Sequence, residues 1–376
     1  MIYFPILALT KNKIPATVVL GYQANEVQSE ITEFGFDNIS FIEQTTQKGT
    51  AHAVLTAQPS WKSADHVLVL NGDTPLVTDE IIKKLVDQHI ADNATVSFVQ
   101  TSVINPSGYG RIIKDGDLIK NIEEKDCTPA QRKIQSINAG IYIFNRVFLE
   151  KHLNELSSNN ANNEFYLPDL IGVASQLGLT VVVMQEPFDK VRGVNTLEEL
   201  WAVEQIKRSE LMKHWMARGV RFELAQNIHL DVDVTIGQDC FIGNGVLLLR
   251  GTTIGQGCVI NAFTIIGNST IGRDTLIRSH TVVQDSTIGD NCIVGPFARI
   301  KGMSIIKDDV KIGSFTEISE SIVENYAGTT TLSYLSNTQV LMNEKVSAGT
   351  IQEQDDDFSL TKKTISLTNK DKTHQL

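Results

Sequence analysis

Cysteine, positive charge and long apolar runs are all scarce in this chain of 376 residues. Its four cysteines show no Cys-x-x-Cys spacing, so we expect them to be buried thiols. The net charge of −11 leaves no basic face to neutralise phosphates, so no nucleic-acid partner is expected. No apolar stretch approaches the roughly 20 residues that span a bilayer, and no basic segment precedes the apolar Met1–Leu9. These features predict a cytoplasmic protein without membrane contact.

Glycine-rich nucleotide-binding motifs are also missing, since the chain has no Gly-x-Gly-x-x-Gly or Walker-type run. What remains is an ordinary globular composition, with 41% hydrophobic and 20% charged residues. A chain of this length predicts two or three domains.

A six-residue repeat runs through the C-terminal third of the chain. An aliphatic residue recurs every six positions, often followed by glycine, with two one-residue slips: Ile236, Ile242, Leu248, Ile254, Ile260, Ile266, Ile271, Ile277, Val283, Ile288, Val294, Ile300, Ile306, Ile312 and Ile318. Neither a helix nor a lone strand has this period, whereas a parallel β-helix built from hexapeptide repeats does. Such a solenoid buries its core by stacking coils, and it can also serve only as a spacer or stalk.

The first 196 residues predict a different fold. Short β-branched runs alternate with helical stretches, which is typical of a parallel α/β sheet. The expected strands are Ala16–Leu20, His66–Leu70, Ala94–Gln100, Gly140–Phe144 and Thr180–Met184, and the expected helices include Asn25–Phe34, Gly49–Ala57 and Asp79–Ala91. We therefore predict an α/β domain over 1–196, a helical arm over 197–227, a β-helix over 228–351 and a polar, loosely attached tail over 352–376.

Polar and glycine-rich clusters in the first domain are candidates for ligand binding. Asp73 follows the His66–Leu70 strand, and a carboxylate at a strand tip can hold Mg²⁺, although a turn residue would look the same. The small residues of Gly49–Ala53 open a helix, where backbone N–H groups can approach a ligand. Two glycines flank Tyr109, and Glu123 and Asn138 could hydrogen bond to a sugar.

These clusters occur in one order along the chain. They are Gln44, Lys48–Ala53, Asn71–Asp73, Gly108–Ile112, Ile122–Asp126, Ile137–Tyr142 and Gly193–Asn195. With the arm and the hexads, they closely resemble the bacterial family of bifunctional N-acetylglucosamine-1-phosphate uridyltransferases/glucosamine-1-phosphate acetyltransferases. The resemblance covers nearly all of 14–351 and implies a Rossmann-like nucleotidyltransferase domain, a helical arm and a left-handed parallel β-helix.

The resemblance also implies an activity and its residues. In the family, N-acetylglucosamine 1-phosphate attacks the α-phosphorus of UTP, giving UDP-N-acetylglucosamine and pyrophosphate, with Mg²⁺ as cofactor. By matching motifs, Asp73 and Asn195 would hold Mg²⁺. Gln44, Gly49 and Thr50 would bind the uracil end, and Gly110, Glu123 and Asn138 would bind the amino sugar. The expected partners are two further copies of the chain, which would form a homotrimer through the β-helix.

One departure from the family concerns the UTP phosphates. The family begins with a strand and a loop similar to Leu-Ala-Ala-Gly-x-Gly-Thr-Arg-Met, followed by a lysine, which wraps those phosphates. This sequence contains no such run, and Met1-Ile2-Tyr3 resembles the segment just after it. We therefore expect an impaired uridyltransferase and explain the difference by a late start or truncation, with a pseudoenzyme as the alternative.

A second departure concerns the acetyltransferase site. Lys301 and Tyr334 match the family, but Thr331 stands where the family has the histidine that acts as general base. A hydroxyl group cannot take that proton near neutral pH, so we expect this activity to be lost and these three residues to be remnants. Two alternatives stay open: a non-catalytic relative that binds sugar nucleotide or regulates, and a hexapeptide acyltransferase with another base such as His280.

Overall fold

The computed structural model describes residues 1–354 and 360–364, and the chain divides into two compact units. The first unit is Met1–Ile206 and the second begins at Lys207. The 20-residue helix α9 (Leu197–Met216) crosses this boundary. The predicted arm is therefore helical over most of its length, and each unit is described by itself below.

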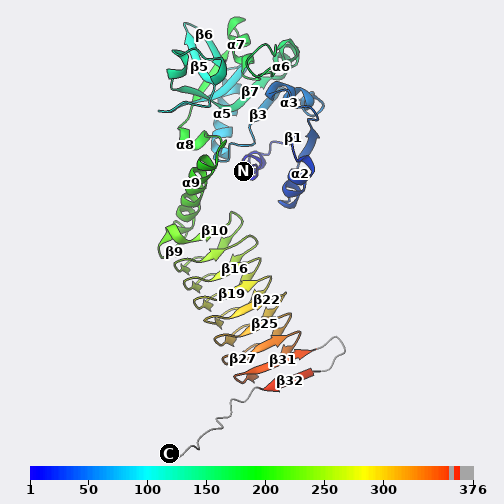
Figure 1. Cartoon of the computed structure of the whole chain (residues 1–376), viewed down its shortest axis with the longest axis vertical. Helices are drawn as coiled ribbons and strands as arrows, with labels where there is room; N and C mark the ends of the chain where they lie inside the picture. The colour runs from blue at the N-terminus through cyan, green and yellow to red at the C-terminus, as the bar shows by residue number, and fades with distance from the viewer. Residues whose placement is uncertain (355–359, 365–376) are drawn as a thin grey trace, which may run out of the picture. The chain divides into compact units, whose positions relative to one another are not determined.

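The first unit is an α/β fold with two sheets (Figure 1). Its strands are β1 (Ala16–Leu20), β2 (Ile39–Glu43), β3 (His66–Leu70), β4 (Val96–Ser102), β5 (Arg111–Asp115), β6 (Leu118–Ile122), β7 (Ser136–Asn145) and β8 (Val181–Gln185). Its helices are α1 (Tyr3–Lys11), α2 (Ala24–Glu33), α3 (Thr50–Thr56), α4 (Gln58–Trp61), α5 (Asp79–Ala91), α6 (Arg146–His152), α7 (Asp169–Gln176) and α8 (Phe188–Val191), before α9.

The larger sheet is mixed rather than wholly parallel. Its order is β6-β5-β7-β4-β8, and β3 pairs with β7. Strand β8 lies parallel to β4, whereas the long strand β7 runs antiparallel to both β3 and β4. In the smaller sheet, β1 and β2 are parallel. The structure therefore keeps the predicted Rossmann-like class, with β7 reversed in the middle of the sheet and β6 reversed at its edge.

Local sequence explains the elements that were predicted correctly. All five predicted strands and the three named helices are confirmed to within a few residues at their ends. Helix α5 shows the reason, because Ile81, Ile82 and Leu85 form one buried face and Thr78 caps its start. Helix α1 and strands β2, β5 and β6 were not among the predicted elements.

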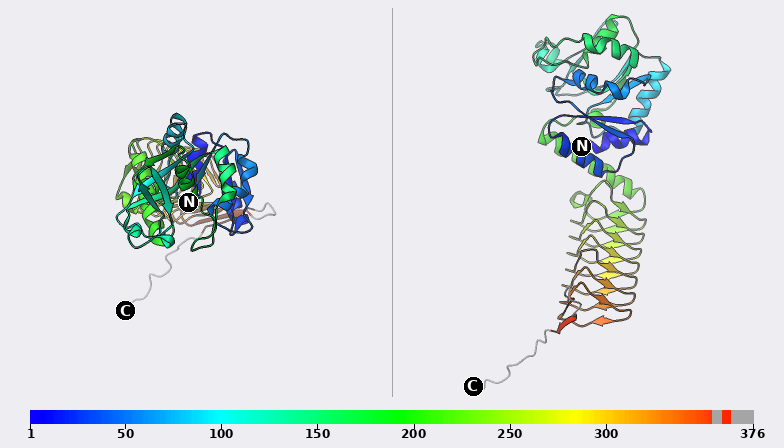
Figure 2. Two further views of the ribbon diagram at one scale, coloured as in Figure 1. Left: turned by 90° about the horizontal axis from the view of Figure 1, so that it is seen from above. Right: turned by 90° about the vertical axis from the view of Figure 1, so that its right-hand side faces the viewer.

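The second unit is a parallel β-solenoid of about seven turns with the left-handed β-helix fold (Figure 2). Three sheets form its faces. One sheet contains β9 (Arg221–Phe222), β12 (Phe241–Ile242), β15 (Val259–Ile260), β18 (Leu276–Ile277), β21 (Ile293–Val294), β24 (Lys311–Ile312), β27 (Gly328–Thr329) and β30 (Lys345–Val346).

The other two faces follow the same pattern. The second contains β10 (His229–Leu230), β13 (Leu247–Leu248), β16 (Ile265–Gly267), β19 (Val282–Gln284), β22 (Arg299–Lys301), β25 (Glu317–Ser319), β28 (Tyr334–Ser336), β31 (Thr350–Gln354) and β32 (Leu360–Thr364). The third contains β11 (Thr235–Ile236), β14 (Thr253–Ile254), β17 (Thr270–Ile271), β20 (Thr287–Ile288), β23 (Ile305–Ile306), β26 (Ile322–Val323) and β29 (Gln339–Val340). Because β9 already pairs with β12, the solenoid begins at Arg221, earlier than the predicted 228.

The hexad residues fill the interior of this solenoid, as the repeat predicts. Ile242, Ile260, Ile277 and Val294 follow one another along one face and are fully buried. Among the described residues, the strands of each coil pair with those of the coil before and the coil after it, which is the quasi-one-dimensional stacking of a repeat protein.

Corner glycines permit the close approach of neighbouring coils, and this gives a first prediction. A Cβ atom on Gly313 would overlap the carbonyl oxygen of Thr330 in the next coil, whereas one on Gly267 would meet Leu249 at an ordinary 3.5 Å. We expect Gly313→Ala to lower the free energy of unfolding by about 1–3 kcal/mol, the usual effect of overpacking, and Gly267→Ala to change it by less than about 0.5 kcal/mol. Equal effects in denaturant titrations of the two variants would contradict this account.

The prediction of a loose tail from residue 352 is wrong for its first residues. Gln352 lies in β31, and β31 pairs antiparallel with β32, so the chain continues the solenoid edge after the last coil. The register joins Thr350 to Thr364 and Gln354 to Leu360. The hexad period could not predict this reversal, because an antiparallel return breaks the repeat. The rest of the predicted tail, 355–359 and 365–376, lies outside the described residues.

Candidate active site

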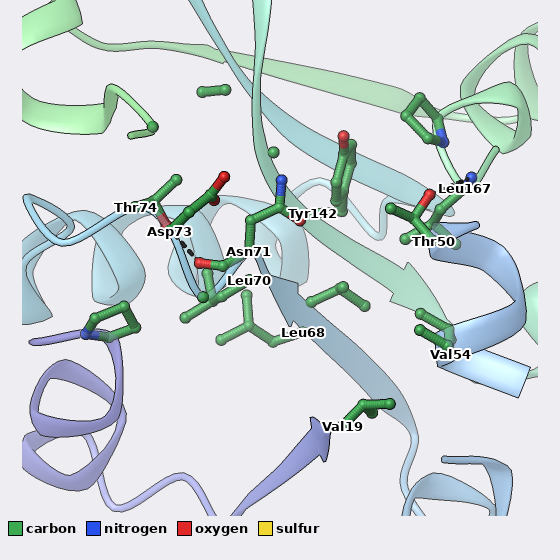
Figure 3. A pocket seen from close by; sticks show the side chains of 18 of the residues that line it. Val19, Thr50, Val54, Leu68, Leu70, Asn71, Asp73, Thr74, Tyr142 and Leu167 are labelled. Atoms are coloured by element: carbon green, nitrogen blue, oxygen red, sulfur yellow. Dashed lines mark hydrogen bonds between the residues drawn. The ribbon is translucent and has the colours of Figure 1, made fainter. Parts of the chain in front are cut away.

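A cavity of about 980 Å³ opens in the first unit between strands β1 and β3. These two strands belong to different sheets and are not paired with each other in the described structure. Val19 of β1 lies on one side of the cavity and Leu68 and Leu70 of β3 on the other (Figure 3). The floor of the cavity is therefore apolar, and its polar groups lie where the strands end.

Asp73 lies at the carboxyl end of β3, beside the segment that contains Asn195. The carbonyl oxygen of Asp73 accepts a hydrogen bond from the Val194 N–H at 3.0 Å, which fixes the two segments to each other. Asp73 and Asn195 both line the cavity. A Cβ on Gly193 would be in ordinary contact with Asp73 Oδ2, at 3.7 Å, so the glycine leaves the space beside this carboxylate open. The structure thus brings together the two residues predicted to hold a metal.

The Asp73 carboxylate suits a cation. Its Oδ1 atom is buried and has no hydrogen-bond partner among the described residues, so it is free to act as a ligand. Burial raises the pKa of Asp73, and the negative charge of Glu199 raises it further. The described residues contain no cluster of three His, Cys, Asp or Glu side chains that could hold a metal ion. One carboxylate and one amide oxygen, completed by phosphate oxygens, fit Mg²⁺.

The predicted sugar-binding residues meet at another part of the same cavity. Gly110, Glu123 and Asn138 all line it. Gly110 lets these two polar side chains come close, because a Cβ there would lie 2.6 Å from Asn121 Oδ1 and 2.9 Å from Glu123 Oε1 and would displace them. The Asn121 amide donates to Glu123 Oε1 at 2.7 Å and so orients the carboxylate. Burial raises the pKa of Glu123.

Asn138 is fixed by its neighbours on β7. Its Nδ2 donates to the Tyr142 hydroxyl at 2.6 Å, and its Oδ1 accepts from the Gly140 N–H at 3.1 Å. Figure 3 shows Tyr142 and Asn71 directed into the same part of the cavity. Asn71 lies against Gly140, which has φ +74° and no space for a side chain. Hydrogen bonds therefore orient the Asn138 side chain, and the absence of a side chain on Gly140 makes room for Asn71.

The three residues predicted to bind uracil are neighbours, since Gln44 Nε2 donates to the Gly49 carbonyl at 3.4 Å, but only Thr50 is among the described residues that line the cavity. Thr50 lines the cavity and accepts a hydrogen bond from the Leu167 N–H at 3.0 Å. Gly49 does not line it: its φ is +99°, and a Cβ there would lie 2.6 Å from the Phe165 carbonyl oxygen. Gln44 also lies outside the cavity lining, with its Nε2 2.7 Å from His52 Nδ1. The positive φ and the close packing against residues 164–167 are therefore sufficient to explain why position 49 is a glycine.

The segment 162–168 was missed by the sequence analysis although it forms one wall of the cavity. Asn162, Glu164, Tyr166 and Leu167 line it. The Phe165 N–H donates to the Lys48 carbonyl at 2.8 Å, and the Ala51 N–H donates to the Phe165 carbonyl at 3.0 Å, so the segment is docked on the start of α3. The only signal in the sequence was a run of Asn residues followed by two aromatic residues.

The residues predicted to be acetyltransferase remnants lie in the solenoid unit. Lys301 forms an ion pair with Glu317 at 2.7 Å, and Tyr334 lies beside Glu317 in the register of β25 and β28. Thr331 is exposed at a corner, where its carbonyl accepts from the Gly349 N–H at 3.2 Å. Lys301 is thus engaged by a carboxylate within the solenoid.

His280, the alternative base, belongs to a column of stacked rings. Its ring lies 5.2 Å from that of Phe263 and 4.8 Å from that of Phe297, and Phe315 continues the stack. Both faces of the imidazole are therefore covered by phenyl rings at successive corners of the solenoid. Packing is sufficient to explain this histidine.

Comparisons with known proteins agree with this geometry. The Nucleotidyl transferase family matches residues 1–190, and the GMPPB C-terminal domain matches residues 224–337. The chain is 36% identical over 337 residues to the bifunctional protein GlmU of Clostridioides difficile, which covers 89% of this chain and 72% of that protein. It is 33% identical to GlmU of Alkaliphilus metalliredigens (89% and 73%) and 36% identical to that of Prochlorococcus marinus (89% and 74%).

The fold and the polar ends of the cavity agree with these matches. No helix in the described part of the chain is long and apolar enough to cross a bilayer. The Nucleotidyl transferase match falls on the α/β unit, and the GMPPB C-terminal domain match falls on the parallel β-solenoid. The chain belongs to the GlmU family of nucleotidyltransferases.

Proposed function

We propose that this protein is a Mg²⁺-dependent uridyltransferase that makes UDP-N-acetylglucosamine from UTP and N-acetylglucosamine 1-phosphate. Membership of the family supports the wider class of sugar-nucleotide pyrophosphorylases. The observation that carries the narrower proposal is one cavity lined by the free Asp73 carboxylate, by Asn195, and by the Gly110, Glu123 and Asn138 group.

The chemistry is an in-line displacement. A phosphate oxygen of the sugar phosphate forms a bond to the α-phosphorus of UTP, the bond from that phosphorus to the bridging oxygen breaks, and pyrophosphate leaves. Asp73 and Asn195 would hold Mg²⁺, which when bound neutralises charge on the phosphate oxygens. Glu123 and Asn138 would orient the sugar by hydrogen bonds, and Thr50 lies where the nucleotide end would bind.

The side chains that line the cavity carry negative charge, and this affects the expected rate of transfer from a triphosphate substrate. Among the described residues that line it there is no lysine and no arginine, whereas Asp73, Glu123 and Glu164 are acidic. A triphosphate would rely on the metal, on backbone groups and on neutral polar side chains, so we propose that transfer by this chain is slow, below the usual enzyme range of about 1–10³ s⁻¹. The same observation favours a second candidate, a relative that binds sugar nucleotide without turnover.

The expected homotrimer, the lost acetyltransferase activity and the hexapeptide acyltransferase alternative remain predictions. A separate assay that follows acetyl-CoA consumption with glucosamine 1-phosphate and other amines addresses the last two. Consumption by this protein would contradict the assignment of Thr331 as a remnant.

The proposed substrates are tested by offering the protein several nucleoside triphosphates and several sugar 1-phosphates with Mg²⁺. We expect mass spectrometry of the products to find UDP-N-acetylglucosamine in the largest amount. A different sugar nucleotide would overturn the substrate assignment, and retention of UDP-N-acetylglucosamine without turnover would support the second candidate.

The buried Glu123 predicts a pH dependence of sugar binding. Burial raises its pKa, so the carboxylate that accepts hydrogen bonds from the sugar becomes protonated at a higher pH than an ordinary glutamate. We expect the affinity for UDP-N-acetylglucosamine, measured by calorimetry, to fall as the pH is lowered through this raised pKa. In Glu123→Gln the affinity should be lower at neutral pH and less dependent on pH. An unchanged pH profile in that variant would show that another group is responsible.

A further inference from the structure

Glu199 forms the first turn of α9 and closes a capping box there. The Glu199 N–H donates to the Thr196 hydroxyl at 3.1 Å, and the Thr196 N–H donates back to Glu199 Oε2 at 3.0 Å. The same Oε2 accepts the Asn195 N–H at 2.7 Å. This side chain therefore fixes the backbone of a residue that we assign to the metal.

The second oxygen of Glu199 reaches a different loop. Its Oε1 accepts a hydrogen bond from the Tyr109 hydroxyl at 3.3 Å. Tyr109 precedes Gly110 in the sugar-binding loop, lines the cavity and packs edge-on against Phe188. Burial and the charge of Glu199 raise the pKa of Tyr109 to about 12, so its hydroxyl remains a donor at neutral pH.

A capping box alone does not need the second contact. It uses one carboxylate oxygen, and the neighbouring Glu198 already supplies a negative charge to the same helix turn while remaining exposed. What distinguishes Glu199 is that each of its oxygens holds a loop that contributes a ligand-binding residue. Segments 90 residues apart in the sequence are joined through one side chain.

We propose that Glu199 is a positioning residue that couples the metal loop, residues 193–195, to the sugar loop, residues 108–110. This inference rests on the proposed function for the identity of the two ligands. Ordering of Asn195 by the metal fixes the start of α9 and with it Glu199, which holds Tyr109 and the sugar loop in the binding geometry. Metal and sugar nucleotide should therefore bind cooperatively, each raising the affinity for the other by the same factor.

The test is the affinity for UDP-N-acetylglucosamine, measured by calorimetry with and without Mg²⁺. The ratio of the two affinities is the coupling factor, which typically lies between about 5 and 150. We expect the factor to fall toward 1 in Tyr109→Phe, which removes only the hydroxyl group and leaves the capping box intact. In Glu199→Ala it should fall to the same level, and adding Tyr109→Phe to that variant should have no further effect.

Glu198→Gln is the matched control, because it removes one negative charge from the same helix turn without touching either loop. Its coupling factor should equal that of the wild type. An unchanged factor in Tyr109→Phe, or an equal loss in Glu198→Gln, would overturn the inference while leaving the proposed function standing. A wild-type protein that binds no UDP-N-acetylglucosamine would overturn the proposed function and this inference together.

Discussion

Replacing Asp73 by asparagine is expected to lower uridylyl transfer by at least about 100-fold, because metal stabilisation of a transferring phosphoryl group contributes several kcal/mol. The substitution keeps the size of the side chain and removes the charge of its buried, unpartnered oxygen. It also keeps the backbone bond from Val194 to the Asp73 carbonyl, so the strand tip and the metal loop should stay together.

The measurement is the initial rate as a function of Mg²⁺ concentration, with metal affinity measured separately by Mn²⁺ binding. Asp73→Asn should show a lower rate at every concentration and much weaker Mn²⁺ binding. Asp92→Asn is the control, because Asp92 is exposed at the end of α5 and does not line the cavity. Full Mn²⁺ affinity in Asp73→Asn would show that the metal is held elsewhere.

Removing the side chain of Arg111 is expected to cost the first unit about 1–3 kcal/mol of stability, because it leaves the partly buried Glu124 carboxylate and two backbone carbonyls without their donor. Arg111 is 1% exposed. It pairs with Glu124 at 2.5 Å and donates to the carbonyls of Tyr109 and Arg132. Arg111→Ala should therefore lower the denaturant midpoint and also weaken sugar-nucleotide binding, because Tyr109 loses a support of its loop.

Arg132→Ala provides the matched control for this prediction. The Arg132 side chain is exposed, and only its backbone carbonyl contacts Arg111, so the same substitution there should change stability by less than about 0.5 kcal/mol. Similar losses of stability in the two variants would show that the contacts of the Arg111 side chain do not stabilise the unit. The unfolding of the solenoid unit should be the same in both.

The sequence was sufficient to predict those features of the fold and the site that depend on a local pattern of residues or on their order along the chain. The hexad period predicted the solenoid because stacking places every sixth side chain inside. Asp73 could be recognised because a strand of four aliphatic residues ends just before it. Asn195, in the Gly193–Asn195 cluster just before the arm, could be proposed as a second metal ligand, but the hydrogen bond that joins its segment to Asp73 links residues more than a hundred positions apart.

The remaining features depend on contacts that no local pattern shows. Gly49 looked like a ligand-binding glycine, but its close neighbour is the Phe165 backbone. Glu199 lies in the first turn of a helix, where an acidic residue is common, and nothing near it in the sequence indicates Tyr109 as its second partner. Gln352 was assigned to a polar tail, although it continues a sheet edge.

Pyrophosphate release from UTP, N-acetylglucosamine 1-phosphate and Mg²⁺ tests the central claim most directly. The account predicts slow release that requires all three components, appears in equal amount with UDP-N-acetylglucosamine and is lost in Asp73→Asn. No release from the folded protein, or release that persists unchanged in Asp73→Asn, would contradict the assignment of this cavity as a uridyltransferase site.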